Sequence, residues 1–376
     1  MNKFENPRIA IVADFLTQLG GSERVILELT KIYPTAPIYT LFFNKAKMGS
    51  FFPKQKIQPL FTNYILNKFY KQLLVFYPFF FKRLKLKNYD IIITVTSALA
   101  KGIKKEKGQI HICYCNTPTR FLWIDKYDYI ATAVPRGLQW LMRMIVPWLQ
   151  KVDFRVAQKV DYFIANSREV QKRIKKFYQI GSVIIYPPVD TDFFSLQTNR
   201  QDYFLMTGRI VPYKRFDVAV KAFAKMPQKK LIIAGSGPEL NKLKTIATKN
   251  VQFVGRVSDE KLKVLYQNAR AYIFTPLEDF GITSVEAMSC GTPVIAYGEG
   301  GALETIKENV SGIFFSQQTP QSLLGAITRF DAKKFNPQEV RAVALRFRQK
   351  RFNMKIKGFV GRIYHQHNLL TLRKNQ

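Results

Sequence analysis

The chain has 376 residues, 47% of them hydrophobic, which is long enough for two globular domains with separate cores. Its formal net charge of +33 predicts an anionic partner: a nucleic acid, an acidic membrane face or a phosphorylated ligand. The longest apolar and aromatic run, residues 73–81, is about half the length that a membrane-spanning helix needs, so we expect no such helix.

Three cysteines, Cys113, Cys115 and Cys290, form no Cys-x-x-Cys pair, and residues 1–7 lack the apolar core of a signal peptide. We therefore expect a cytoplasmic protein, with peripheral contact to the inner face of the cell membrane if its charge serves lipid binding. His111 shares one face of a predicted strand with Cys113 and Cys115, but no fourth ligand is evident. No metal site is expected.

The first predicted strand, residues 8–13, leads through a loop containing Gly20 and Gly21 into a helix over residues 23–32. Ser22 is expected to cap that helix. A glycine pair before a helix lets the backbone approach a ligand closely. The spacing is not G-x-G-x-x-G, which argues against a dinucleotide-dependent oxidoreductase.

Residues 68–87 interleave aromatic side chains with lysine and arginine around Pro78, and residues 135–151 form an apolar, helix-like stretch with Trp140 and Trp148. Both segments fit an interface with anionic lipid, and both equally fit packing against the core. Aromatic and basic residues also suit single-stranded nucleic acid, but no nucleic-acid-binding motif accompanies them.

A strand over residues 109–114 runs into a loop that contains Asn116 and Arg120. Asn116 cannot act as a general base, although its amide can hydrogen-bond a hydroxyl. Farther along, Asp190 and Asp192 follow a Pro-Pro pair, which favours a linker loop over a metal site.

We place the boundary between the two domains in this region, with a first domain over residues 1–196 and a second over residues 197–351. The second domain begins with a strand that ends at Gly208. Arg209 and Lys214 then bring two cations to the loop before a helix, as binding of a diphosphate requires.

A predicted strand over residues 271–274 is followed by Glu278, a helix beginning near Ile282, and Glu286 within about two turns of that helix start. Two carboxylates at the carboxyl end of a strand are placed to bind the hydroxyls of a sugar and a ribose, and phosphates favour the adjacent helix N-terminus.

These segments resemble the motifs of one family, the retaining group 1 (GT4-type) glycosyltransferases of the GT-B fold. Residues 278–286 resemble its E-x7-E signature, residues 208–214 its G-R-x-x-x-x-K segment, and residues 20–24 its G-G-x-E-[RK] loop. Residues 113–120 resemble its C-Y-x-H-T-P-x-R segment, with Asn116 in place of the usual histidine.

The resemblance implies an α/β protein with two Rossmann-like domains facing each other across a cleft, and a C-terminal helix, residues 352–376, that crosses back to the first domain. It implies transfer of a hexose, for which mannose is the suggestion, from a GDP- or UDP-sugar to an acceptor hydroxyl. The suggested acceptor is a lipid-linked or cell-surface polysaccharide precursor, and no metal or other cofactor is needed. Two alternatives stay open: a basic nucleic-acid-binding protein, and a GT-B epimerase or phosphorylase.

The resemblance also assigns residues to roles. It gives catalytic roles to Glu278, Arg209 and Lys214 and places the acceptor near Asn116 and Arg120. The donor-binding positions that it implies are Gly20, Gly21, Gly208, Arg209, Lys214, Gly255, Arg256, Glu278, Phe280, Gly281, Ile282, Thr283 and Glu286.

Overall fold

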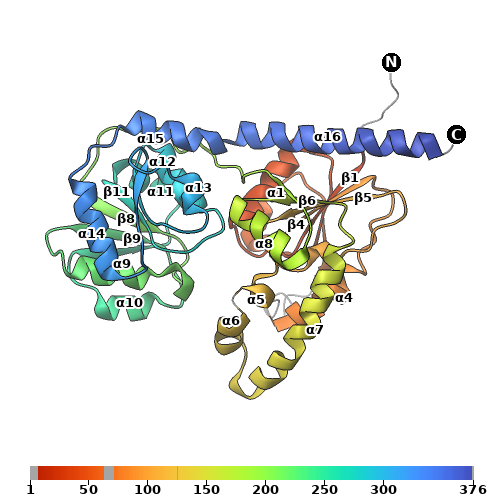
Figure 1. Cartoon of the computed structure of the whole chain (residues 1–376), viewed down its shortest axis with the longest axis horizontal. Helices are drawn as coiled ribbons and strands as arrows, with labels where there is room; N and C mark the ends of the chain where they lie inside the picture. The colour runs from red at the N-terminus through yellow and green to blue at the C-terminus, as the bar shows by residue number, and fades with distance from the viewer. Residues whose placement is uncertain (1–6, 63–71, 125, 375–376) are drawn as a thin grey trace. The chain divides into compact units, whose positions relative to one another are not determined.

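The chain folds into two compact units, which a computed structural model describes for residues 7–62, 72–124 and 126–374 (Figure 1). Unit 1 comprises Met1–Pro187 together with Phe352–Gln376, and unit 2 comprises Pro188–Arg351. The division therefore lies within the Pro187-Pro188 pair, upstream of the expected boundary after residue 196. Asp190 lies in a local turn, where its carboxylate accepts a hydrogen bond from the Phe193 N–H at 3.0 Å.

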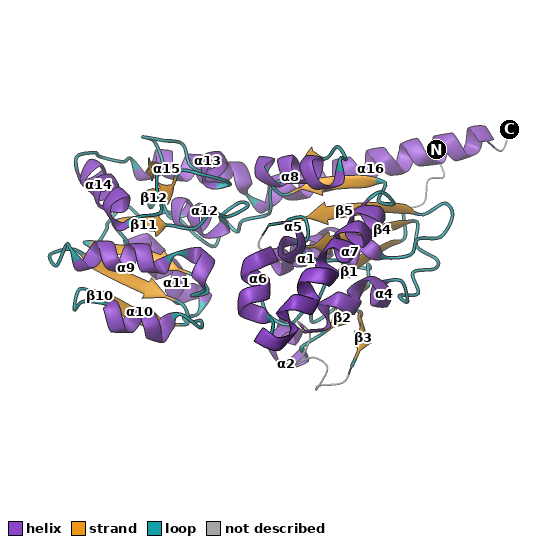
Figure 2. Ribbon diagram, turned by 60° about the horizontal axis from the view of Figure 1, so that its bottom comes forward, coloured by secondary structure: helices purple, strands orange, loops and turns teal. Residues whose placement is uncertain are grey.

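Unit 1 is built on a parallel sheet in the order β3-β2-β1-β4-β5-β6-β7. Its inner strands are near-continuous apolar runs because helices cover both faces of the sheet, as Figure 2 shows. The strands are β1 Ile9–Ala13, β2 Ile38–Phe42, β3 Ile57–Phe61, β4 Ile91–Thr96, β5 Ile110–Cys115, β6 Tyr162–Ala165 and β7 Val183–Ile184.

Alternation along β1 divides its side chains between two cores. Ile9 and Ile11 pack in the core shared with α1 and α16, whereas Ala10 and Val12 pack in the core shared with α4 and α7. The helices of unit 1 are α1 Gly21–Ile32, α2 Lys45–Met48, α4 Tyr77–Phe81, α5 Arg120–Trp123, α6 Lys126–Ala133, α7 Gln139–Ala157, α8 Arg168–Tyr178 and α16 Gln349–Lys374.

The C-terminal helix α16 belongs to unit 1 because its apolar stripe packs there. Phe352, Ile356 and Val360 recur at intervals of four residues and are buried against α1 and β1. Asn353 adds a hydrogen bond from its amide to Glu28 Oε1 at 2.7 Å. Burial of each such apolar side chain stabilises the fold by roughly 1.5–3 kcal/mol.

The aromatic and basic segment predicted around Pro78 divides its side chains between core and surface. Tyr77 and Phe81 of α4 are fully buried, whereas Phe76 and Phe79 are about half exposed. Pro78 lies in the first turn of α4, where a missing N–H costs no helical hydrogen bond. Residues 68–71 of the segment lie outside the described residues.

Unit 2 repeats the architecture with a parallel sheet in the order β10-β9-β8-β11-β12-β13. Its strands are β8 Tyr203–Thr207, β9 Lys230–Ala234, β10 Val251–Gly255, β11 Ala271–Phe274, β12 Val294–Tyr297 and β13 Gly312–Phe315. Its helices are α9 Phe216–Ala224, α10 Leu240–Ile246, α11 Asp259–Asn268, α12 Ile282–Ser289, α13 Ala302–Thr305, α14 Pro320–Asp331 and α15 Pro337–Ala344.

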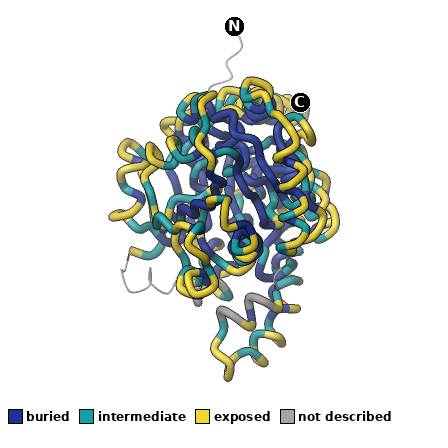
Figure 3. Tube along the Cα trace, turned by 90° about the vertical axis from the view of Figure 1, so that its left-hand side faces the viewer, coloured by how far each residue is buried: buried dark blue, intermediate teal, exposed yellow. Residues whose placement is uncertain are grey.

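The central strands form the most deeply buried part of each unit (Figure 3). The strand predicted over residues 271–274 is confirmed as β11, and the helix expected near Ile282 is confirmed as α12. The expected capping by Ser22 is wrong. Helix α1 begins at Gly21 with Gly20 as its N-cap, so Ser22 lies within the first turn. Of the helices in the described residues, none has both the length and the hydrophobicity needed to cross a bilayer.

Candidate functional site

The loop after β8 brings the backbone and a lysine side chain close together. Gly208 follows β8 with a φ of +133°, a conformation that side chains other than that of glycine rarely allow. A Cβ atom on Gly208 would lie 3.0 Å from Lys214 Nζ, so the glycine also makes room for the ammonium group. Lys214 ends the short 3₁₀ turn Pro212–Lys214 that precedes α9.

Lys214 forms an ion pair with Glu278, the first glutamate of the E-x7-E segment. Lys214 Nζ lies 3.0 Å from Glu278 Oε1, and the two side chains are 15% and 19% exposed. Burial is the largest single influence on the pKa of Lys214 and acts to lower it, but the Glu278 carboxylate together with Tyr213 and Tyr272 raises that pKa above its ordinary value. The structure thus places a permanent cation beside a carboxylate at the carboxyl end of the sheet.

Helix α12 begins at a backbone that glycine shapes. Gly281 is its N-cap with a φ of +86°, and a Cβ atom there would lie 2.9 Å from the Phe274 ring. The preceding loop is fixed by a hydrogen bond from the Gly301 N–H to the Glu278 carbonyl at 2.9 Å. Phe280 is buried and packs edge-on against Phe347. Ile282 and Thr283 open the helix and are partly exposed.

Glu286 lies one to two turns into α12, where it is only 2% exposed. The Tyr266 hydroxyl on α11 donates to Glu286 Oε2 at 3.2 Å. Tyr266 lies 2.9 Å from the hydroxyl of Thr207, the residue immediately before Gly208, and Thr207 lies 3.2 Å from the Tyr272 hydroxyl. The buried hydroxyls of Tyr266, Thr207 and Tyr272 therefore form a chain that leads from Glu286 to β8 and on to β11.

Sequence reasoning missed Thr207, Tyr266 and Tyr272. Their hydroxyls lie on β8, α11 and β11, which are separated along the chain and meet only through the sheet order. The sequence signal that they leave is weak: Thr207 and Tyr272 are hydroxyl-bearing residues on strands whose other residues are mostly apolar.

The remaining donor-side residues are more peripheral. Gly255 ends β10 with a φ of +71° and accepts a hydrogen bond from the Gly235 N–H at 2.7 Å. Arg209 and Arg256 extend from the loops after β8 and β10, and both are exposed. The structure thus brings Gly208, Lys214 and Glu278 into one cluster. The two arginines lie outside this cluster, on the solvent-exposed side of their loops.

On unit 1, the glycine loop and the Asn116 loop meet. Asn116 follows β5, and its amide donates to Ser22 Oγ in the first turn of α1 at 3.0 Å. Its backbone N–H donates to the Thr96 carbonyl at the end of β4. Arg120 begins α5 four residues later and is partly exposed. Three of the predicted positions, Gly20, Gly21 and Asn116, therefore lie at the carboxyl end of the unit 1 sheet.

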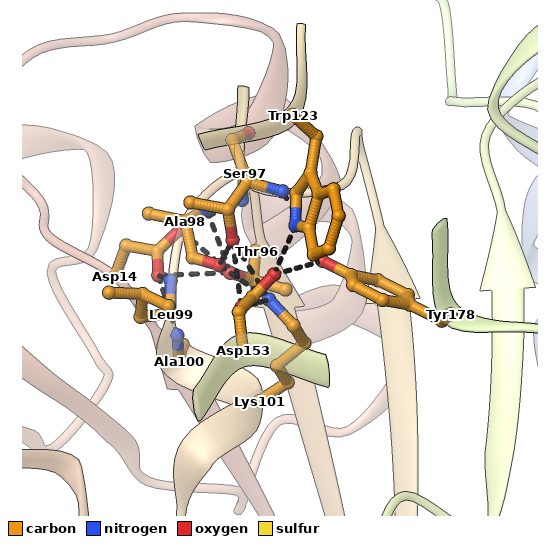
Figure 4. Close-up of polar contacts among 11 residues, drawn as sticks. Asp14, Thr96, Ser97, Ala98, Leu99, Ala100, Lys101, Trp123, Asp153 and Tyr178 are labelled. Atoms are coloured by element: carbon orange, nitrogen blue, oxygen red, sulfur yellow. Dashed lines mark hydrogen bonds and ion pairs between the residues drawn. The ribbon is translucent and has the colours of Figure 1, made fainter. Parts of the chain in front are cut away.

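Asp14, which follows β1, organises the loop after β4 (Figure 4). Its carboxylate accepts hydrogen bonds from the Thr96 hydroxyl and from four backbone N–H groups at 2.8–3.0 Å. The four donors belong to Ser97, Ala98, Leu99 and Ala100. Burial raises the pKa of Asp14, although these donors act in the opposite direction.

A buried ion pair lies next to this loop (Figure 4). Lys101 Nζ is 2.6 Å from Asp153 Oδ1 on α7, and the side chains are 1% and 0% exposed. Asp153 also accepts hydrogen bonds from Trp123, Tyr178 and Thr119 at 2.7–3.0 Å. Because Thr119 belongs to the Asn116–Arg120 loop, this network holds the back of that loop in place.

His111 is a buried residue of β5. Its Nε2 lies 3.0 Å from the Thr94 hydroxyl, and burial lowers its pKa to about 3, so it is neutral at physiological pH. Within the described residues, no group of three or more His, Cys, Asp or Glu side chains is placed to hold a metal ion.

Two family models match the chain and together span most of it. Residues 19–193 match the model described as Glycosyltransferase Family 4, and residues 189–342 match the model described as Glycosyl transferases group 1. The two matched regions correspond closely to units 1 and 2.

Curated relatives match over shorter segments. An uncharacterized glycosyltransferase of Methanocaldococcus jannaschii, MJ1607, is 34% identical over 134 residues, covering 33% of this chain and 34% of the relative. The D-inositol 3-phosphate glycosyltransferase of Mycolicibacterium smegmatis is 29% identical over 184 residues, covering 42% of each protein. The matched segments thus span less than half the length of these relatives.

Solved structures match over nearly the whole chain. Anabaena Alr3699/HepE in complex with UDP and glucose superimposes with a TM-score of 0.68 at 18% identity, covering 95% of this chain and all of that one. Sucrose-phosphate synthase from Thermosynechococcus elongatus gives a TM-score of 0.72 at 18% identity, covering 96% of this chain and 100% of that one. At these identities, the likeness shows the fold alone.

Proposed function

Because the chain belongs to the group 1 glycosyltransferases and has their GT-B fold, we propose that it transfers a hexose from a nucleoside-diphosphate sugar to an acceptor hydroxyl with retention of configuration. The observation that carries the proposal is the 3.0 Å pair between Lys214 and Glu278 beside the Gly208 loop. A cation and a carboxylate at this place can bind a diphosphate and a sugar hydroxyl next to each other.

The diphosphate is assigned to Lys214, Arg209 and the N-terminus of α12. Negative charge grows on the leaving diphosphate as the glycosidic bond breaks, so fixed cations and helix N–H groups stabilise the transition state more than the ground state. Lys214 is held in place by Glu278, whereas Arg209 is exposed and has to fold onto the ligand. We assign this charge stabilisation to side chains and not to a metal ion.

The sugar and the nucleoside are assigned to the two glutamates and the flanking loops. Glu278 and the backbone of residues 280–283 hold the hexose, Glu286 accepts hydrogen bonds from the ribose hydroxyls, and the Gly255-Arg256 turn faces the base. UDP-hexose is the first donor to test, because HepE is described in complexes with UDP and UDP-glucose. GDP-mannose is the second.

The acceptor is assigned to unit 1, near Asn116 and Arg120. Three buried side-chain oxygens on the loops after β1, β5 and β6 have no hydrogen-bond partner within the described residues: Thr17 Oγ1, Thr117 Oγ1 and Asn166 Oδ1. Unsatisfied buried oxygens are costly, so a polyhydroxylated acceptor that supplied donors to them would gain affinity.

Asn116 cannot take the proton of the acceptor hydroxyl, so we assign the proton to the leaving group. The acceptor oxygen bonds to the anomeric carbon on the face from which the diphosphate departs. The electron pair of the broken bond goes to the phosphate oxygen, which receives the acceptor proton. Each atom and charge is accounted for without a protein base.

The proposal is tested by Glu286→Ala, with Glu260→Ala on an exposed site of α11 as the control. A thermal-shift panel of UDP-, GDP- and ADP-sugars identifies the donor, and hydrolysis and transfer of that donor are then measured. We expect Glu286→Ala to lose more than about a hundredfold in turnover while still unfolding cooperatively. Turnover by Glu286→Ala at the wild-type rate would refute the assignment of the site. Conversion of the sugar without an added acceptor would indicate an epimerase or phosphorylase instead of a transferase.

We also propose that unit 1 binds an anionic membrane, from which a lipid-linked acceptor is taken. The surface, here called the aromatic face, consists of Phe76, Phe79, Trp140, Met144 and Trp148. These side chains are 46% to 69% exposed, and Phe79 stacks on Trp148 with ring centroids 6.2 Å apart. Exposed aromatic rings of this kind suit the boundary between lipid headgroups and acyl chains.

Charge around the aromatic face favours anionic lipid. Exposed basic side chains flank it, whereas Asp153, the acidic residue of α7, is fully buried in its ion pair. The flanking cations are Lys82, Arg83, Arg136, Arg143 and Lys151.

Vesicle flotation tests this membrane proposal. Wild-type protein is expected to bind vesicles that contain anionic lipid at low salt, and Trp140→Ser combined with Trp148→Ser is expected to weaken binding about tenfold or more. Met354→Ser, at an equally exposed site on α16, is the control. Absence of binding by the wild type, or equal binding by all variants, would refute the proposal.

A further inference from the structure

The chain of buried hydroxyls behind Glu286 carries an inference that rests on the proposed ribose contact of Glu286. We infer that Tyr266 is a positioning residue: it orients the Glu286 carboxylate toward the ribose and thereby sets the preference of the enzyme for ribonucleotides over deoxyribonucleotides. Tyr266 itself does not contact the nucleotide in this proposal.

The four side chains of the network are removed from water. Tyr266 and Tyr272 are 0% and 1% exposed, Glu286 is 2% exposed, and Thr207 is 6% exposed. Water therefore does not compete for the Tyr266–Glu286 hydrogen bond, and a hydrogen bond to a charged group in such surroundings is stronger than one at the surface.

Each hydroxyl has one proton, which fixes the direction of the chain. Tyr266 donates its proton to Glu286, so the 2.9 Å contact with Thr207 has Thr207 as the donor. The Thr207 proton is then used, so Tyr272 is the donor in its contacts with Thr207, which are 3.2 Å to Oγ1 and 3.3 Å to the backbone carbonyl. The Tyr266 and Thr207 hydroxyl dipoles therefore both point toward the carboxylate, and hydrogen bonds aligned in this way strengthen one another.

Tyr266 is a rigid support because its ring and backbone are held on several sides. The Thr292 hydroxyl donates to the Tyr266 carbonyl at 2.6 Å. The Tyr266 ring packs edge-on against Phe194 and Tyr272, with centroids 5.7 and 5.6 Å away. Its hydroxyl is therefore fixed at Glu286 Oε2, which limits rotation of the carboxylate.

A carboxylate with a fixed orientation distinguishes a ribose hydroxyl from a hydrogen atom better than one that is free to turn. When the orientation is right, a deoxyribose leaves a buried acceptor without its partner, and the complex is penalised. When the carboxylate can rotate, it finds other donors and the penalty shrinks. Loss of the Tyr266 hydroxyl should thus reduce the ratio between the affinities for the ribonucleotide and the deoxyribonucleotide. It should have less effect on the affinity for the diphosphate, which both nucleotides share.

The test uses full-length protein and the most tightly bound of UDP, GDP and ADP, each compared with its 2′,3′-dideoxy counterpart by calorimetry. In Tyr266→Phe, which removes only the hydroxyl, we expect the ratio of the two dissociation constants to fall about tenfold. The matched control is Tyr203→Phe. Tyr203 is also buried in unit 2, and its hydroxyl donates to the Leu265 carbonyl of α11 at 2.8 Å without contacting Glu286.

The outcomes separate this inference from the function on which it rests. If the wild type binds none of the nucleotides or does not prefer the ribose form, the ribose role of Glu286 is wrong and the inference falls with it. If the wild type and Tyr203→Phe discriminate and Glu286→Gln does not, the ribose role stands. The inference is then overturned if Tyr266→Phe discriminates as the wild type does.

Thr207→Val is a second variant, which removes the next hydroxyl of the chain while keeping the side-chain volume. If Tyr266→Phe does not fold, this variant decides, with an expected fall in the ratio of about threefold. A positioning role also predicts that turnover of the donor sugar shows a larger change in KM than in kcat. If Tyr266→Phe does not fold and Thr207→Val has the same ratio of dissociation constants as the wild type, the inference is overturned.

Discussion

Two of the lysine–carboxylate pairs in the protein have similar lengths and opposite surroundings. In unit 1, Lys101 and Asp153 lie 2.6 Å apart and are 1% and 0% exposed. In unit 2, Lys214 and Glu278 lie 3.0 Å apart and are 15% and 19% exposed. The chemistry of the two pairs is the same, and the difference in burial matches the structural role of the first pair and the binding role that we propose for the second.

The buried pair is closed to ligands because every group around it is already used. Asp153 accepts from Trp123, Tyr178 and Thr119, and the Lys101 ammonium also donates to the Ala98 carbonyl and to Thr119. The pair in unit 2 keeps part of its surface open, which is what the proposed binding of a diphosphate to Lys214 requires. Satisfied networks specify structure, and partly open ones can bind.

Breaking the buried pair should have the largest effect. Asp153→Ala leaves the Lys101 ammonium buried without its partner, and we expect the free energy of unfolding to fall by about 3–5 kcal/mol. Urea unfolding followed by circular dichroism measures the loss. The double variant Lys101→Met, Asp153→Leu is the control, because it removes both charges together and should recover much of the stability. A double variant as unstable as Asp153→Ala would contradict this account.

Breaking the open pair should affect catalysis and leave the fold intact. For Lys214→Ala we expect donor turnover to fall by about 10²–10³-fold, or about 2.7–4 kcal/mol, because a cation at the leaving diphosphate is lost. The melting temperature should stay close to that of the wild type, since the pair is partly solvated. Lys221→Ala, at an exposed position of α9, is the control and should retain activity. Turnover near that of the wild type in Lys214→Ala would refute its assignment.

The same contrast explains what could be predicted from the sequence. The local structure around Gly208 and Glu278 was predictable because these residues lie in short segments with local rules: a buried strand, a glycine at a helix start and cations after Gly208. Strand β11 and the start of α12 at Ile282 were therefore predicted at the right residues. The helix start at Gly21 was missed because Gly20 takes the extended N-cap conformation that was assigned to Ser22.

The networks behind the sites were not predictable, since their partners are far apart along the chain. Asp14 binds the loop after β4 more than eighty residues away, and Lys101 meets Asp153 of α7 with strand β5 and helices α5 and α6 between them in the chain. Such contacts depend on the order of strands in the sheet and on where helices pack against it, which no short sequence pattern reveals. Tyr266 and Glu286 meet for the same reason.

Glu23 can also be compared with Glu278. It is a buried carboxylate beside the glycine loop, and its electrostatic surroundings differ from those of Glu278. It lies in the first turn of α1 and is 7% exposed. Burial raises its pKa from 4.5 to about 7, the backbone N–H groups of Glu23 and Gly20 oppose this rise, and the nearby Asp14 adds to it. Glu278, in contrast, has Lys214 at its side.

The raised pKa of Glu23 predicts a stability difference that depends on pH. Between pH 4.5 and about 7 the folded state binds more protons than the unfolded state, so this group loses its stabilising contribution as the pH rises through 7. Glu23→Gln cannot ionise, and we therefore expect its stability relative to the wild type to increase by about 2–3 kcal/mol between pH 5 and pH 8. Urea unfolding across this range measures the change, and Glu106→Gln at an exposed site is the control. Parallel curves for Glu23→Gln and the wild type would show that Glu23 is paired in the folded protein, as Glu278 is.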